Sequence, residues 1–309
     1  MGNDRKAAVV LSGGGAKGAF QAGALEVLNE NGYTFDFISG VSVGALNGAM
    51  LATDQFPQLI EIWKNVKERD VLKRRGLVSV ASQFIRYKIG LGKPPKAVNS
   101  NRPLKRLMEE QLLDKKVDRP FHFGFVVLDT GDFVNAVVRS GDHAINRQDI
   151  ERILASTAIP VIYDPVIGPN GKTWVDGGVR NITPIGQILP YNPDEIVIIP
   201  TEPFKAKEKE EEVPLDDIVQ ILQRTIDVML EEIFRNDIRQ CLLINRLVKQ
   251  AAEDGTTLTK PNGTPYKYYE VTLIDPEKEL GSDQDFSRGK LDERFRMGRE
   301  RAAEMLRNG

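Results

Sequence analysis

The chain has 309 residues, and 42 Lys and Arg against 44 Asp and Glu give a formal net charge of only −2. This length is sufficient for a full hydrophobic core, in one large domain or in one domain with an extension. The balanced charge gives no sign of a nucleic-acid partner, and we expect none. The single cysteine, Cys241, excludes an intrachain disulfide, and no apolar run reaches transmembrane length. Without an apolar leader either, the chain is predicted to be cytoplasmic.

The first predicted element is an apolar strand over residues 7–11, which leads into a glycine-rich turn over residues 12–18. A helix with apolar residues at helical spacing follows over residues 19–31. Backbone N–H groups of such a turn can hold an anion. We therefore expect an oxyanion hole among Gly13, Gly14, Gly15, Ala16, Lys17 and Gly18. The Lys17 side chain has two interpretations, support of this electrostatic site or a simple cap on the surface of the turn, and we expect the second.

A second strand, at residues 37–39, ends in a Gly-x-Ser-x-Gly motif, and a small-residue helix is predicted over residues 45–52. At a strand-to-helix turn this motif is a nucleophile elbow, in which small neighbours permit a sharp bend that exposes the serine hydroxyl. The sequence therefore predicts a nucleophile, Ser42, within the elbow formed by Gly40, Val41, Val43 and Gly44.

Further elements follow in an order typical of an α/β protein with a parallel or mixed sheet. We expect a β-hairpin from strands 121–128 and 133–138, and a helix that opens with a capping box at residues 146–149 and closes at Pro160. A short strand at residues 173–175 then delivers Asp176, and residues 195–199 form another buried strand.

A serine nucleophile needs a base, and the chain contains only two histidines, His122 and His143. Neither follows Asp176, so the Ser–Asp–His order of an α/β-hydrolase cannot be built with that acid. We therefore expect the histidines to be structural. Asp176, followed by Gly177 and Gly178, is the best candidate base. No group of residues has metal-ligand spacing, and we expect no metal or other cofactor.

These motifs together resemble the bacterial patatin-like phospholipases. The glycine turn, the elbow and Asp-Gly-Gly occur in the family's order, as do residues 155–160, Asn181, Pro184 and Ile185. The resemblance covers residues 7–200. It implies a three-layer α/β/α core like those of patatin and the acyl-carrier-protein malonyltransferases, and a catalytic dyad of Ser42 and Asp176. It also implies a lipid acyl hydrolase, a phospholipase A or lysophospholipase-type esterase, acting on phospholipids or lysophospholipids.

Three alternatives remain beside hydrolysis. A transacylase would use the same acyl-enzyme with a different acceptor. A non-catalytic lipid-binding module would retain the site without using it. A dinucleotide site is suggested by Gly13-x-Gly15-x-x-Gly18 with Asp36 farther on, but Asp36 precedes the second strand, whereas the Rossmann acid ends it. A Walker A loop is excluded because Gly18, and not Ser or Thr, follows Lys17.

Domain boundaries are predicted near residue 200. Residues 1–200 would form the catalytic domain, and residues 201–309 a mostly helical extension packed on the core. In the extension we expect a solvated charged loop over residues 205–212, a long helix from about Leu215, a strand at residues 269–273 and a final helix.

The segment from Val71 to Arg106 differs from the rest because it contains ten Lys or Arg and no Asp or Glu. Leu77, Val80, Phe84 and Leu91 recur within it at helical spacing. One interpretation is a basic, partly apolar cap that contacts anionic lipid headgroups, which would make the protein peripheral at a membrane. The other is a helix whose apolar stripe packs on the core while its basic residues are solvated.

Overall fold

A computed structural model describes residues 5–141, 143–205, 216 and 218–308. Its main sheet has the strand order β11-β10-β1-β2-β5-β9-β8, with β6 paired to β5. The strands from β11 to β5 run parallel, and β6, β9 and β8 add antiparallel pairs. The bounds of these strands are β1 Ala7–Leu11, β2 Phe37–Gly40, β5 Phe121–Val127, β6 Asp132–Val138, β8 Val166–Ile167, β9 Thr173–Asp176, β10 Glu195–Ile199 and β11 Glu270–Leu273. The predicted mixed sheet and its hairpin are thereby confirmed.

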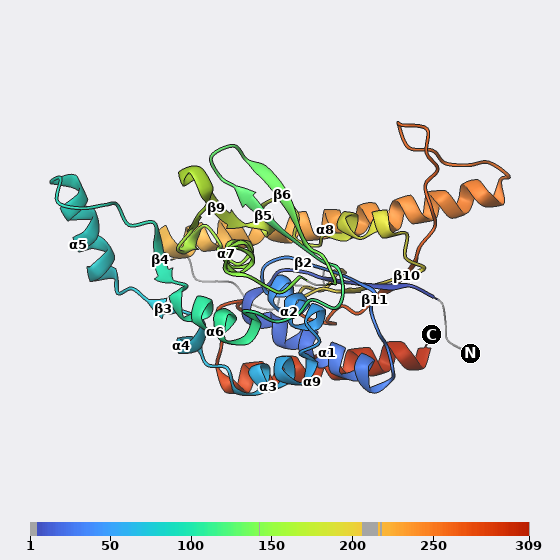
Figure 1. The fold of residues 1–309 in the computed structure, drawn as a ribbon, viewed down its shortest axis with the longest axis horizontal. Helices are drawn as coiled ribbons and strands as arrows, with labels where there is room; N and C mark the ends of the chain where they lie inside the picture. Colours follow the sequence, from blue (N-terminus) through green and yellow to red (C-terminus); the bar gives the residue numbers. More distant parts are fainter. Residues whose placement is uncertain (1–4, 142, 206–215, 217, 309) are drawn as a thin grey trace.

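Helices cover both faces of this sheet, as Figure 1 shows. On one side lie α1, α2, α3, α7 and α9, and on the other lies α8 together with short 3-10 turns. The bounds are α1 Gly18–Glu30, α2 Val43–Ala52, α3 Phe56–Asn65, α4 Glu68–Val71, α5 Leu77–Lys88, α6 Arg102–Leu112, α7 Arg147–Ser156, α8 Ile218–Glu253 and α9 Arg288–Asn308. The 3-10 turns are η1 Gly15–Lys17, η2 Pro169–Gly171, η3 Gly177–Val179, η4 Ile185–Gln187 and η5 Leu189–Tyr191.

The central strand β1 shows why the molecule has three layers. Its side chains alternate between two separate hydrophobic cores: Val9 and Leu11 belong to the larger core, and Ala8 and Val10 to the smaller one beneath α8. All four are fully buried, as expected for a parallel strand covered on both faces. The predicted α/β/α core is therefore confirmed.

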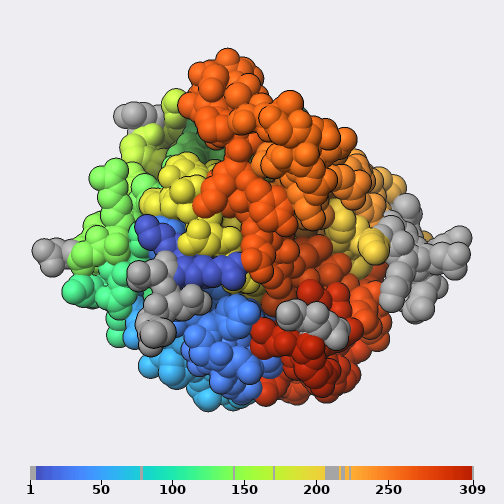
Figure 2. Space-filling model, turned by 90° about the vertical axis from the view of Figure 1, so that its right-hand side faces the viewer, coloured from blue at the N-terminus to red at the C-terminus, as the bar shows by residue number. Residues whose placement is uncertain are grey.

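The C-terminal part of the chain is built into the same layers. Strand β11 pairs in parallel with β10 and extends the sheet. Helix α9 packs along α1 so closely that a side chain at Gly23 or Gly298 would collide with backbone of the other helix. Figure 2 shows the result on the surface, where the first and last segments share one face.

A smaller sheet, β3-β4-β7, lies beside the main one and carries the basic segment. Its strands are β3 Lys73–Arg74, β4 Ala97–Ser100 and β7 Val161–Tyr163. From it α5 projects away from the core in Figure 1. The side chains of Phe84, Ile85, Ile89 and Leu91 are 48–65% exposed. The interpretation that the apolar stripe of this segment packs on the core is therefore wrong for Phe84 and Leu91.

Most predicted boundaries agree with the structure within a few residues. Asn146 caps α7 as expected, its side chain accepting hydrogen bonds from the amides of Gln148 and Asp149, 2.8 and 3.1 Å away. The helix ends at Ser156, earlier than the predicted stop at Pro160. The charged run predicted as a loop over residues 205–212 lies, after Lys205, outside the described residues.

Candidate active site

Ser42 stands at a sharp turn between β2 and α2. Its backbone has φ 56° and ψ −125°, a conformation that costs energy for any residue except glycine. A Cβ at Gly40 would collide with the Gly44 carbonyl, and one at Gly44 with the carbonyl of Leu11. Only glycines permit this approach of strand and helix. The local structure is thus the sharp strand-to-helix turn that a nucleophile elbow requires.

Asp176 ends β9 and lies in the buried interior beside the elbow. Its Oδ1 accepts a hydrogen bond of 2.7 Å from the Gly178 amide, whereas its buried Oδ2 has no partner of ordinary geometry. Burial raises the pKa of Asp176 from 3.8 to about 7, although the Gly178 amide and the nearby Ser42 hydroxyl both lower it. The carboxyl group is therefore a far better proton acceptor near neutral pH than an ordinary aspartate.

The glycine-rich turn lies directly against the elbow: a Cβ at Gly13 would stand 3.2 Å from Cβ of Ser42. Several of its amides already donate, because the N–H of Gly13 bonds the Ile182 carbonyl at 3.2 Å and that of Ala16 bonds the Asp283 carbonyl at 2.7 Å. The amides of Lys17 and Gly18 donate to carbonyls within the turn itself. Within the described residues, this leaves the amides of Gly14 and Gly15 available to an anion.

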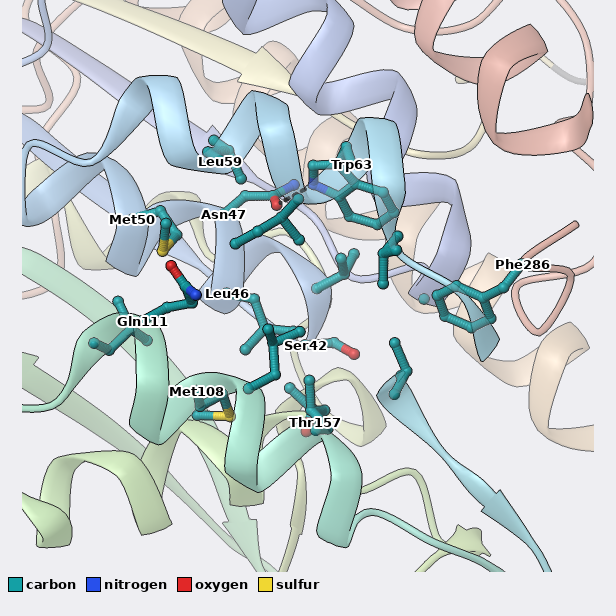
Figure 3. A pocket seen from close by; sticks show the side chains of 18 of the residues that line it. Ser42, Leu46, Asn47, Met50, Leu59, Trp63, Met108, Gln111, Thr157 and Phe286 are labelled. Atoms are coloured by element: carbon teal, nitrogen blue, oxygen red, sulfur yellow. Dashed lines mark hydrogen bonds between the residues drawn. The ribbon is translucent and has the colours of Figure 1, made fainter. Parts of the chain in front are cut away.

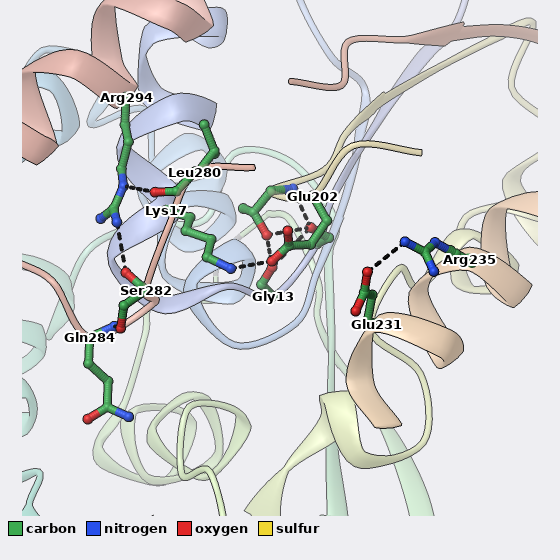
Figure 4. A network of polar contacts seen from close by, with 11 residues as sticks. Gly13, Lys17, Glu202, Glu231, Arg235, Leu280, Ser282, Gln284 and Arg294 are labelled. Atoms are coloured by element: carbon green, nitrogen blue, oxygen red, sulfur yellow. Dashed lines mark hydrogen bonds and ion pairs between the residues drawn. The ribbon is translucent and has the colours of Figure 1, made fainter. Parts of the chain in front are cut away.

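Lys17 is not a surface cap, and that expectation is wrong. Its side chain is only 13% exposed and forms an ion pair with Glu202, just beyond β10 (Figure 4). The pair ties the start of α1 to the neighbouring strand. Lys17 therefore stabilises the base of the turn from inside the protein.

A buried polar network supports the same turn from below. Gln21 Nε2 donates to the carbonyls of Ser12 and Ile199 at 2.9 and 3.0 Å, and its Oε1 accepts from Asn47 Nδ2 at 2.9 Å. Asn47 Oδ1 in turn accepts from Trp63 Nε1 at 2.9 Å. These bonds fix α1, α2 and α3 relative to the ends of β1 and β10.

Both histidines form side-chain hydrogen bonds, as expected of structural residues. His122 contacts the Tyr191 hydroxyl at 2.7 Å and Asn135 Oδ1 at 3.2 Å, and His143 contacts Asp149 Oδ2 at 2.9 Å. Asp36 accepts a hydrogen bond of 2.9 Å from the amide of Ala7, at the start of β1. The glycine turn follows the opposite end of that strand, so Asp36 cannot serve a ligand bound at the turn.

A deep apolar cavity opens beside Ser42 between α2, α3 and α6 (Figure 3). Its lining side chains surround about 890 Å³ of empty space, counted out through the open mouth. Its walls are mainly aliphatic, aromatic and thioether side chains, including Leu46, Met50, Leu59, Trp63, Leu104, Leu107, Met108, Leu112 and Phe286. Such a lining suits a hydrocarbon chain.

Sequence reasoning missed this cavity, although one signal was present. Leu46 and Met50 are four residues apart, which places both on one face of α2, the helix that begins directly after Ser42. It also missed the Ser156 hydroxyl, which accepts a hydrogen bond of 3.1 Å from the Ser42 amide. Within the described ranges, no group of three or more His, Cys, Asp or Glu could hold a metal ion. None of the described helices is both long and apolar enough to cross a membrane.

Comparison with known proteins identifies the class of this chain. The sequence model of the patatin-like phospholipase family matches residues 9–189, which include the glycine turn, the elbow and Asp176. The chain belongs to this family, and the resemblance drawn from its motifs is confirmed.

Individual relatives match over shorter stretches. Lysophospholipase nte1 of Aspergillus terreus is 48% identical over 50 residues, which is 16% of this chain and 3% of that protein. Patatin-like phospholipase domain-containing protein 7 of Rattus norvegicus is 46% identical over 55 residues, which is 18% of this chain and 4% of that protein. These matches thus span a very small part of the relatives. The crystal structure of VipD from Legionella pneumophila shares the fold, with a TM-score of 0.51 and 12% identity over 99% of this chain and 67% of VipD.

Proposed function

We propose that this protein hydrolyses the acyl esters of phospholipids or lysophospholipids through an acyl-Ser42 intermediate. The observation that carries the proposal is the position of Ser42: a strained elbow holds it at the wall of an apolar cavity. Family membership and the names of the relatives, a lysophospholipase and a phospholipase-domain protein, support the same reaction.

In the proposed mechanism, Ser42 Oγ attacks the ester carbonyl carbon while Asp176 takes the hydroxyl proton. Negative charge then develops on the carbonyl oxygen, and the free amides of Gly14 and Gly15 stabilise it. Collapse of the tetrahedral intermediate breaks the ester bond, and the leaving alcohol receives the proton from Asp176. A water molecule, deprotonated by the same carboxylate, then attacks the acyl-enzyme and releases the fatty acid.

The raised pKa of Asp176 supports its role as the single base. A carboxylate with a pKa near 4 takes a proton from serine with difficulty, whereas one with a pKa of about 7 is matched to neutral pH. Its unpartnered Oδ2 is the atom available for the proton.

The apolar cavity supports the proposal that the substrate carries a long acyl chain. Each methylene group moved from water into an apolar site contributes about 0.8 kcal/mol. A chain bonded at Ser42 would run between α2 and α6, along Leu46, Met50 and Met108.

We further propose that α5 contacts the membrane that contains the substrate. Phe84, Ile85, Ile89 and Leu91 expose apolar surface at the far end of the molecule, and Arg86 and Lys88 lie among them. This combination of apolar and basic side chains is typical of segments that bind anionic lipid surfaces.

A fluorophosphonate probe tests the nucleophile. We expect covalent labelling of the wild-type protein and none of Ser42→Ala, with the labelled peptide containing residue 42. Wild-type protein that resists the probe would contradict the mechanism. Release of free fatty acid from phospholipid, measured with and without an added lysolipid acceptor, separates hydrolysis from transacylation.

Vesicle binding tests the membrane contact. Reversing Arg86, Lys88 and Lys93 to Glu should weaken binding to vesicles containing phosphatidylserine, and added salt should weaken the wild-type binding similarly. Hydrolysis of a short soluble ester should remain unchanged. Equal losses on soluble and vesicular substrates would mean that these residues support the fold instead.

A further inference from the structure

A second pocket, separate from the acyl cavity, lies between α5, the small sheet and the start of α6. Lys73, Arg102 and Arg106 line it, together with the polar side chains of Ser79, Gln83 and Ser100. We call it the basic pocket. Arg102 and Arg106 are four residues apart on one face of α6, whereas Leu104 and Met108, two positions along, face the acyl cavity. The helix therefore forms the wall between the two sites.

The positive charge of the basic pocket is only partly compensated. Arg74 and Arg75, which also line it, pair with Glu68 and Asp164 respectively. In the described part of the chain, no carboxylate lies within ion-pair distance of Lys73, Arg102 or Arg106. Three cations thus converge there without an acidic partner. Two of them are arginines, whose planar donors match a phosphate group.

Two independent features indicate that the pocket is arranged for an anion. Ser100 is 6% exposed and lines the pocket, yet its buried hydroxyl has no hydrogen-bond partner. Leaving such a hydroxyl unsatisfied is costly, and it lies at the wall of the pocket. The N-terminus of the eleven-residue helix α6 also opens here, and Asn101 makes no side-chain cap to its free amides. A helix N-terminus attracts negative charge.

We propose that the basic pocket binds a phosphate group, as carried by the headgroup of an anionic lipid. This site does not depend on the proposed ester hydrolysis, whereas its lipid source rests on the proposed membrane contact of α5. The lipid source is favoured because Ser79 and Gln83 belong to α5, the helix that exposes apolar surface. A phosphomonoester headgroup with two negative charges fits three uncompensated cations better than a single-charged headgroup does.

Binding of inorganic phosphate, measured by calorimetry and by the shift in Tm, tests the site directly. We expect the wild-type protein to bind phosphate, and Arg102→Gln/Arg106→Gln to bind at least tenfold more weakly. The matched control is Lys115→Gln/Lys116→Gln, which removes two exposed charges outside both the pocket and α5 and should bind normally. Ser100→Ala should fold normally and also bind more weakly. Equal phosphate affinity in wild type and Arg102→Gln/Arg106→Gln, or no binding above that of chloride at equal ionic strength, would overturn the proposal.

Vesicles distinguish the two sources of phosphate. Phosphatidylcholine vesicles containing phosphatidic acid should bind the wild-type protein more tightly than vesicles of equal charge made with phosphatidylserine. That preference should disappear in Arg102→Gln/Arg106→Gln and persist in Lys115→Gln/Lys116→Gln. Binding of inorganic phosphate without this preference would assign the pocket to a soluble phosphate and overturn the lipid source.

Discussion

The elbow region and the basic segment are built in opposite ways. Around Ser42, glycines bring the backbones of β1, β2 and α2 into contact, and side chains there are buried and bonded. Between Val71 and Arg106, a helix projects from a small sheet, and most of the described side chains of residues 79–96 are exposed. The proposed role of the first region depends on fixed backbone geometry. The proposed role of the second depends on charge and on exposed apolar area.

This difference predicts different tolerance to mutation. In the elbow region, a single added methyl group meets backbone atoms that cannot move, so small changes should abolish activity. In the basic segment, effects should be graded, additive and sensitive to salt.

Asp176→Asn should have the largest effect. It keeps the shape of the site but removes the proposed proton acceptor. Loss of a general base typically lowers the rate by roughly 10²–10⁴-fold, and we expect kcat to fall by that factor. In the wild-type protein, kcat/KM should rise with pH through about 7, because only the deprotonated carboxylate can act. Steady-state assays of a soluble ester measure both effects. His122→Gln serves as the control and should retain activity. An active Asp176→Asn together with an inactive His122→Gln would refute the dyad.

Gly15→Val tests the oxyanion turn. Gly15 has φ 53°, and a Cβ there would collide with the Asp283 carbonyl that bonds the Ala16 amide. The distortion should remove a donor and lower kcat by roughly 10²–10³. Gly32→Val is the matched control, because Gly32 also has positive φ but faces open space. Full activity of a folded Gly15→Val protein would show that the turn has another purpose.

Leu46→Trp should shorten the preferred acyl chain by filling the cavity next to Ser42. Each methylene excluded from the cavity costs about 0.8 kcal/mol, or roughly fourfold in kcat/KM. Activity on long p-nitrophenyl esters should therefore fall at least ~10-fold, while the butyrate ester is little affected. Leu243→Trp, at an exposed position of α8, should leave the chain-length profile unchanged. A parallel loss on all chain lengths would indicate a damaged fold.

The smallest effect concerns stability. Because the folded-state pKa of Asp176 is about 7 and its ordinary value 3.8, the folded protein holds a proton between these pH values that the unfolded chain has lost. This group's contribution to stability therefore falls as pH rises from about 4 to about 7. Asp176→Asn, which cannot ionise, should gain Tm relative to wild type by roughly 2 °C or more between pH 5 and pH 8. Calorimetric melts at both pH values check this, and an unchanged difference would contradict a buried, ionising carboxyl group.

Much of the site could be predicted from the sequence because its signals are local. The Gly-x-Ser-x-Gly turn needs glycines where backbones touch, and Asp176 must follow a strand to enter the interior. The alternation and length of apolar runs likewise indicated most strands and an α/β protein with a parallel or mixed sheet, whereas the three-layer arrangement was implied by the family resemblance. Such constraints act between residues near one another in the chain, so they can be recognised as short motifs in the sequence.

What depended on distant contacts was decided only by the tertiary structure. The C-terminal third contains no chemical motif, yet it supports the glycine turn. Buried Arg294 donates to the carbonyls of Leu280 and Ser282, at 2.9 and 2.7 Å, and so holds a loop in place (Figure 4). The same loop contains Asp283, whose carbonyl accepts the hydrogen bond from the Ala16 amide. The burial of Lys17 against Glu202 depends in the same way on residues 185 positions apart. The exposure of α5 and the unpaired charges of the basic pocket follow from which surfaces remain uncovered after the layers pack. Burial is a property of the assembled chain, and no local spacing encodes it.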